Sequence, residues 1–106
     1  MEGEKKKILI VDDDTFLLDM YAFKFSQNNF EVYTATGGVQ AIQKITDGLS
    51  PDIILMDLQM PVLDGIRATQ QIKANFSHIK IIIISMHDES QFVTHLMELG
   101  ANGYLL

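Results

Sequence analysis

Short apolar runs alternate with longer amphipathic segments along the 106 residues of the chain. In residues 6–11, 53–56 and 80–85 the apolar positions are continuous rather than alternating with polar ones. Runs of this kind are typical of parallel strands that are covered on both faces of a sheet. We expect two shorter strands, one over 31–34 and one that starts at Gly103 and runs to the end of the chain.

The segments between these strands carry apolar residues every three or four positions, which predicts four helices. We expect them over about 15–27, 39–47, 66–73 and 88–100. Asp14 is suited to cap the first helix, Asn28 and Asn29 to end it, Asp64 and Gly65 to open the third, and Asp88 with Gln91 to form a capping box for the fourth. The residues that we expect to face the core are Phe16, Leu17, Met20, Tyr21 and Phe25, then Ala41, Ile42 and Ile45, then Ile66, Thr69 and Ile72, and finally Phe92, Val93, Leu96 and Met97.

A strand followed by a helix therefore recurs four times before a fifth strand. Strands that alternate with single helices imply one parallel sheet joined by right-handed crossovers. A chain of 106 residues fits a single domain, and no internal repeat or linker interrupts the pattern. We expect one α/β domain over residues 1–106.

Composition excludes several classes of function. The net charge of −6 argues against nucleic-acid binding, because phosphates require a basic face. No apolar run approaches the length of a membrane span, and the charged start lacks the apolar core of a signal peptide. Without cysteine the chain has no disulfide, thiolate metal site or cysteine nucleophile. We expect a cytoplasmic protein, since a reducing compartment is compatible with this composition.

Acidic residues follow two of the predicted strands. Asp12 and Asp13 come directly after the first strand, and Asp57 comes directly after the third. The carboxyl ends of parallel strands share one edge, where open α/β sheets place their chemistry, so three carboxylates would converge there. Such a cluster is unfavourable without a cation, and Mg²⁺ suits oxygen ligands and phosphate. Asp57 could then accept a phosphoryl group, with Ser85 at the end of the fourth strand offering a hydroxyl to it.

Five segments resemble the receiver domains of bacterial-type two-component response regulators. They are 8–13 (ILIVDD), 51–61 (PDIILMDLQMP), 63–65 (LDG), 81–85 (IIIIS) and 100–105 (GANGYL). Each segment is weak alone, but the set occurs in order, with the spacing of the family, across nearly the whole chain. The resemblance implies a flavodoxin-like, doubly wound parallel sheet with strand order 2-1-3-4-5 and helices on both faces.

The resemblance also assigns the chemistry of the acidic edge. Asp57 would be the phosphoacceptor and also a ligand of Mg²⁺. Asp13 would bind Mg²⁺ directly, Asp12 would bind it through water, and the backbone carbonyl of Gln59 would be a further ligand. The domain would assist its own phosphoryl transfer and hydrolysis without being a turnover enzyme.

The same resemblance implies a switch and a partner. Ser85 would turn its hydroxyl toward the phosphoryl group, and Tyr104 would move inward with it, which changes the surface of the fourth helix and fifth strand. The donor would be a phosphohistidine on a sensor histidine kinase or a histidine phosphotransfer protein. The sequence leaves open a homodimer, an output domain and the identity of the pathway.

Two features depart from the family. Its phosphate-pairing lysine would come directly after Leu106, so the 106 residues contain no catalytic lysine, and Lys80 lies at the wrong end of its strand. The fifth helix of the family would also lie beyond Leu106. We therefore expect a shortened domain with an exposed apolar patch that tends to associate or exchange elements. Met86 stands where the family favours a small residue, and we expect it to slow phosphoryl exchange with small donors.

Two other functions stay open. One is a receiver-like module that binds proteins without taking phosphate. The absence of the phosphate-pairing lysine from the 106 residues keeps this alternative open. The other is a phosphatase or phosphotransferase with an aspartate nucleophile on the first strand, but Phe16 stands where that motif requires Thr or Val. Asp14 fits a helix cap better than a metal ligand. No metal-binding spacing joins the three histidines, for which we expect loop or surface positions: His78, His87 and His95.

Overall fold

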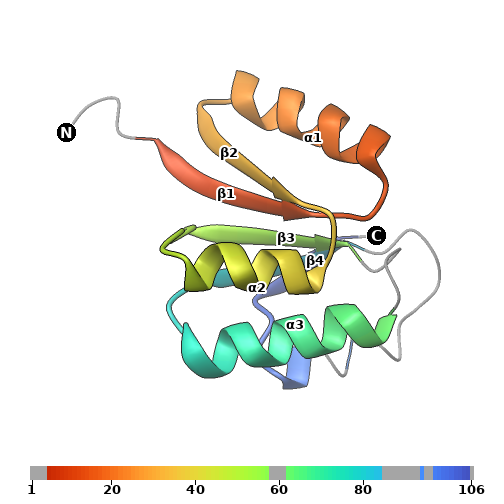
Figure 1. Ribbon diagram of the computed structural model, residues 1–106, viewed down its shortest axis with the longest axis vertical. Helices are drawn as coiled ribbons and strands as arrows, with labels where there is room; N and C mark the ends of the chain where they lie inside the picture. Colours follow the sequence, from red (N-terminus) through yellow and green to blue (C-terminus); the bar gives the residue numbers. More distant parts are fainter. Residues whose placement is uncertain (1–4, 58–61, 85–93, 95–96, 106) are drawn as a thin grey trace.

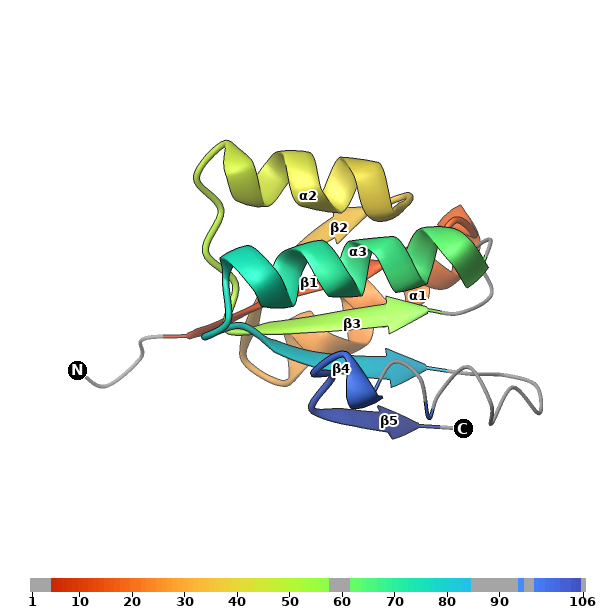
Figure 2. The same ribbon diagram turned by 90° about the horizontal axis from the view of Figure 1, so that it is seen from below.

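The computed structural model describes residues 5–57, 62–84, 94 and 97–105, and every structural statement below refers to these residues. Five strands form one parallel sheet in the order β2-β1-β3-β4-β5. They are β1 (Lys6–Val11), β2 (Phe30–Ala35), β3 (Ile53–Asp57), β4 (Lys80–Ile84) and β5 (Gly103–Leu105). Helix α1 (Thr15–Gln27) lies on one face of the sheet, and α2 (Gly38–Thr46) and α3 (Val62–Asn75) lie on the other (Figure 1, Figure 2). The predicted flavodoxin-like topology is confirmed.

Successive residues of the inner strands enter two different apolar clusters. Toward α2 and α3 the strands direct Leu9, Val11, Ile54, Met56, Ile81 and Ile83. Toward α1 they direct Ile8, Ile10, Leu55 and Ile84. Both alternating sets are buried, which explains why the strands are continuously apolar. Burial of one such side chain contributes about 1.5–3 kcal/mol.

The predicted ends of the first helix are confirmed, and the second helix begins and ends one residue earlier than predicted. The Asp14 carboxylate accepts hydrogen bonds from the backbone N–H groups of Phe16 (2.9 Å) and Leu17 (3.2 Å), which satisfies two of the donors that an α-helix leaves unpaired at its start. After α1 the chain turns through Asn29 with φ at 70°, and after α2 it turns through Gly48 with φ at 120°. Asparagine and glycine tolerate this left-handed conformation, which ends both helices.

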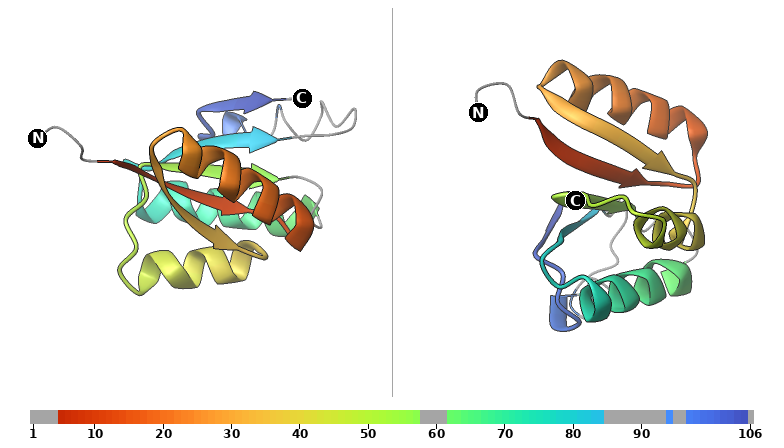
Figure 3. Two further views of the ribbon diagram at one scale, coloured as in Figure 1. Left: turned by 90° about the horizontal axis from the view of Figure 1, so that it is seen from above. Right: turned by 60° about the vertical axis from the view of Figure 1, so that its left-hand side comes forward.

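The predicted buried face of α1 is wrong in part. Phe16 is 75% exposed and Met20 is 46% exposed, whereas Leu18, which we did not expect in the core, is only 4% exposed. Tyr21 and Phe25 pack against the core from its edge. The helix is apolar on two sides, and both sets of residues repeat at helical spacing, so periodicity could not choose between them. The packing of α1 over β1 and β2 decides the choice (Figure 3).

Three smaller differences concern the second half of the chain. Helix α3 begins at Val62 and includes Gly65, which we expected to precede it. Met97, which we expected in the core, is 36% exposed. β4 ends at Ile84. For the fourth helix, the predicted capping box (Asp88 and Gln91) and three predicted core positions (Phe92, Val93 and Leu96) lie outside the described residues. The side chain of Ile66, a predicted core position of α3, also lies outside them.

Hydrogen bonds join the residue before β5 to α3 and β4. The Asn102 side-chain oxygen accepts hydrogen bonds from the Ile81 backbone N–H (3.0 Å) and from Lys73 Nζ (3.2 Å). Lys73 Nζ also donates to the Ile79 carbonyl (2.9 Å), and its stem packs beside Gly100. We call these residues the β5 clamp. The clamp fixes β5 at the end of the sheet opposite Asp57.

Candidate functional site

The strand register brings two acidic residues together at the carboxyl edge of the sheet. Val11 of β1 lies beside Met56 of β3, and the next residues along the two strands are Asp12 and Asp57. Asp12 is fully buried and Asp57 is 3% exposed. On its other side Asp57 lies beside Ile84 of β4. Two carboxylates from strands 45 positions apart in the sequence are therefore neighbours with little access to solvent.

Asp12 has one oxygen paired and one oxygen without a partner. Its Oδ1 accepts a hydrogen bond from the Asp14 backbone N–H (2.9 Å), and its own N–H donates to the Ala35 carbonyl (3.1 Å). Its Oδ2 is buried and has no hydrogen-bond partner within the part of the chain that the structure describes. A buried carboxylate oxygen without a partner costs free energy, so this oxygen is suited to a cation or an ordered water.

Asp13 does not complete a closed cluster with these two acids. Its side chain is exposed, and Asp14 is engaged as the cap of α1. Among the described residues, no group of three or more His, Cys, Asp or Glu side chains is placed to hold a metal ion. The convergence of Asp12, Asp13 and Asp57 around one ion therefore stays a prediction, while Asp12 and Asp57 do meet.

The acidic pair affects the pKa of Tyr21 in α1, which the sequence did not predict. Its pKa is raised above the ordinary value of 10.0, first by burial and then by the negative charges of Asp57 and Asp12. Negative charge nearby disfavours the tyrosinate form. The pattern identified Tyr21 only as a core position of α1, and nothing in its spacing indicated that the helix carries it toward the edge of the sheet where the acids lie.

The remaining predicted site residues are placed only in part. Gln59 and Ser85 lie outside the described residues. Tyr104 lies in β5 beside Ile83 of β4 and is 50% exposed. Its predicted movement with Ser85 stays a prediction.

The described residues fit a magnesium ion at this edge. Mg²⁺ takes one or two carboxylates and completes its shell with waters and phosphate oxygens, so it does not require three protein carboxylates. The unpartnered oxygen of Asp12 beside Asp57 supplies the hard, negatively charged ligands that such an ion prefers.

A profile of the family described as response regulator receiver domain matches residues 8–106. The chain belongs to this family. Receiver domains are signalling domains rather than members of a conventional enzyme family, and they generally use Mg²⁺ for phosphorylation. The family that the sequence suggested is thus confirmed, and the fold agrees with it.

Individual receiver domains resemble the chain closely. The oxygen regulatory protein NreC of Staphylococcus aureus (strain JH9) is 39% identical over 103 residues, which cover 94% of this chain and 47% of that protein. A receiver domain from Clostridium thermocellum superposes with a TM-score of 0.87 at 30% identity, covering 94% of this chain and 80% of that one. The response regulator TrrA of Thermotoga maritima, solved in complex with Mg²⁺ and BeF, gives a TM-score of 0.83 at 25% identity, covering 95% and 85%.

These similarities concern the receiver domain alone. The chain spans about half the length of the curated relatives that it matches. None of the described helices is long and apolar enough to cross a membrane.

Proposed function

We propose that this receiver domain accepts a phosphoryl group on Asp57 from a phosphohistidine of a partner sensor kinase or phosphotransfer protein in the cytoplasm. A carboxylate oxygen of Asp57 forms a bond to phosphorus while the phosphorus–nitrogen bond of the donor breaks. The electron pair stays on the imidazole nitrogen, which takes a proton from solvent. The observation that supports the proposal is the buried pair of Asp12 and Asp57 at the carboxyl edge of the sheet, where Asp12 Oδ2 has no partner among the described residues.

The other residues of the edge hold the reacting groups in place. Asp12, through water, and Asp13, directly, would hold Mg²⁺ together with the Gln59 carbonyl. When bound, the ion would neutralise negative charge on the transferring phosphoryl oxygens. Asp14 fixes the backbone of this loop by capping α1, which keeps the Asp12 carboxylate aimed at the edge. TrrA was solved in complex with Mg²⁺ and BeF, which supports the proposal that this chain binds Mg²⁺ and a phosphoryl group.

Phosphorylation would then change the surface near β5. Ser85 would contact the phosphoryl group and Tyr104 would turn from its half-exposed position into the space beside β4, so the phosphate selects one of two conformations. An output domain or a partner that recognises this surface would read the change.

The test is Mg²⁺-dependent binding of beryllofluoride, which mimics a phosphoryl group, monitored by ¹⁹F NMR. We expect binding to the wild type, none to Asp57→Asn, and unchanged binding to Asp19→Asn, which removes an exposed carboxylate of α1. Failure of the wild type to bind, both in this chain and in a form extended past Leu106 to include a lysine, contradicts the proposal. That result favours a receiver-like module that binds proteins without taking phosphate.

A further inference from the structure

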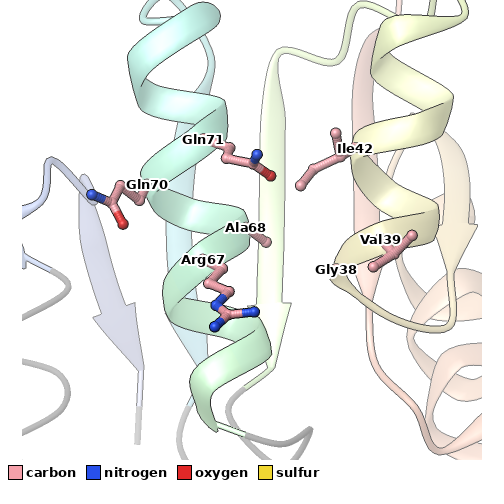
Figure 4. Close-up of a pocket in the computed structure, with 7 residues that line it drawn as sticks. All are labelled: Gly38, Val39, Ile42, Arg67, Ala68, Gln70 and Gln71. Carbon is pink, nitrogen blue, oxygen red and sulfur yellow. The ribbon is translucent and has the colours of Figure 1, made fainter.

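A groove runs between α2 and α3 on the face of the sheet opposite α1. Its first part has a volume of about 400 Å³ and lies between α2 and α3, where it is lined by Gly38, Val39 and Ile42 of α2 and by Arg67, Ala68, Gln70 and Gln71 of α3. A second hollow of about 230 Å³ adjoins it, because Ile42 and Gln71 line both. Figure 4 shows Ile42 and Gln71 pointing toward each other across the first part.

The floor and one lip of the groove are apolar. Ala68 and Ile72 of α3 lie at its base, and Ile42 of α2 forms its wall. Val39 stands at the lip with 76% of its surface exposed. Single exposed apolar residues are common, but this one continues an apolar surface that has no cover among the described residues.

Among the described residues that line the groove, one is charged: Arg67, at the end nearer the start of both helices. Its side chain is exposed, and it makes no hydrogen bond or ion pair with another residue in the portion of the chain that the structure describes. The remaining polar lining consists of neutral amides and one hydroxyl, from Gln70, Gln71, Thr46 and Asn75. A cation at one end of an apolar groove selects a ligand that is apolar along its length and negative at one end.

The dimensions of the groove favour a helix over a small molecule. It is open along one side, whereas sites for small molecules enclose most of the ligand surface. Between Gly38 and Thr46 it extends about 12 Å at 1.5 Å per residue, which is a little more than two helical turns. Two turns accommodate the anchors at i, i+4 and i+7 of an amphipathic helix that packs on two others.

We infer that the α2–α3 groove of this chain binds an amphipathic helix of a partner protein, with a carboxylate of that helix paired to Arg67. This surface lies outside the acidic edge, so the inference does not depend on the phosphorylation of Asp57.

The test measures fluorescence anisotropy with defined 15-residue helical peptides. The probe carries leucines at i, i+4 and i+7 and two glutamates, one placed a helical turn before the first leucine and one a turn after the last. Its matched control carries glutamine at both of these positions. We expect Arg67→Gln to weaken binding of the glutamate probe about threefold, as for an exposed ion pair, and to leave binding of the glutamine peptide unchanged. Val39→Glu should weaken both peptides more strongly, and Lys24→Gln on α1 should weaken neither.

Methyl NMR locates the bound peptide. We expect the probe to shift the methyl signals of Val39 and Ile42 and to leave those of Ile8 and Ile10, on the opposite face, unchanged. The inference is overturned if no probe binds the wild type, if Arg67→Gln weakens both peptides equally, or if the shifts fall on the α1 face.

Discussion

Replacing Asp57 by asparagine should stabilise the protein in the absence of Mg²⁺. Asp57 and Asp12 are buried neighbours on adjacent strands, which lie about 4.8 Å apart in a sheet. Two unit charges about 5 Å apart repel each other by roughly 3 kcal/mol at an effective dielectric constant of 20. Water and other contacts of Asp57 relieve part of this repulsion, so we expect a gain of about 1–2 kcal/mol in the free energy of unfolding.

Thermal unfolding followed by circular dichroism measures this gain. In EDTA at neutral pH, the unfolding temperature of Asp57→Asn should exceed that of the wild type by about 4–8 °C for each 1 kcal/mol gained in the free energy of unfolding. Mg²⁺ at ten times its dissociation constant should stabilise the wild type by about 1.4 kcal/mol and the variant by much less. Asp19→Asn removes one exposed charge and controls for net charge. The reasoning is refuted if Asp57→Asn unfolds at or below the wild-type temperature in EDTA, or if Asp19→Asn gives the same increase.

Three further changes test other contacts. Asp14→Ala removes both cap hydrogen bonds of α1 and should lower the free energy of unfolding by about 1 kcal/mol in urea titrations, whereas Asp14→Asn should cost less. In a pH titration of the Tyr21 ring signals by NMR, Asp57→Asn should lower the pKa of Tyr21, because a charge that raises it is removed; an unchanged value would show that the charge of Asp57 does not contribute. Lys73→Met keeps the apolar stem of the side chain but leaves the Asn102 oxygen with one donor fewer. It should lower the free energy of unfolding by about 1–2 kcal/mol and speed amide exchange most in β5.

The sequence predicted the sheet well because its inner strands are buried on both faces. A run such as residues 6–11 cannot be placed at the surface, and single helices between strands leave one connection pattern. The helix ends were also predictable, since Asp14 and Asn29 act through their own neighbouring backbone. These features depend on local chemistry or on a strong repeating pattern.

Features that depend on packing between distant elements were not predictable. Phe16 and Leu18 are equally apolar, and only the position of α1 on the sheet decides that the second is buried. The proximity of Tyr21 to the acids and the groove beside Arg67 arise in the same way, from how helices lie on strands remote in the sequence. For the acidic edge, sequence reasoning brought Asp12 and Asp57 together correctly, because register follows from parallel pairing, but it could not orient Asp13.

The β5 clamp holds the edge strand where it enters the sheet, through Asn102 and Lys73. Tyr104 and Leu105 at the other end are at least half exposed, and β4 is the strand beside them among the described residues. Ile84 of β4 lies beside Asp57 on one side and beside Leu105 on the other, so β4 is the direct path by which a change at Asp57 would reach the exposed end of β5.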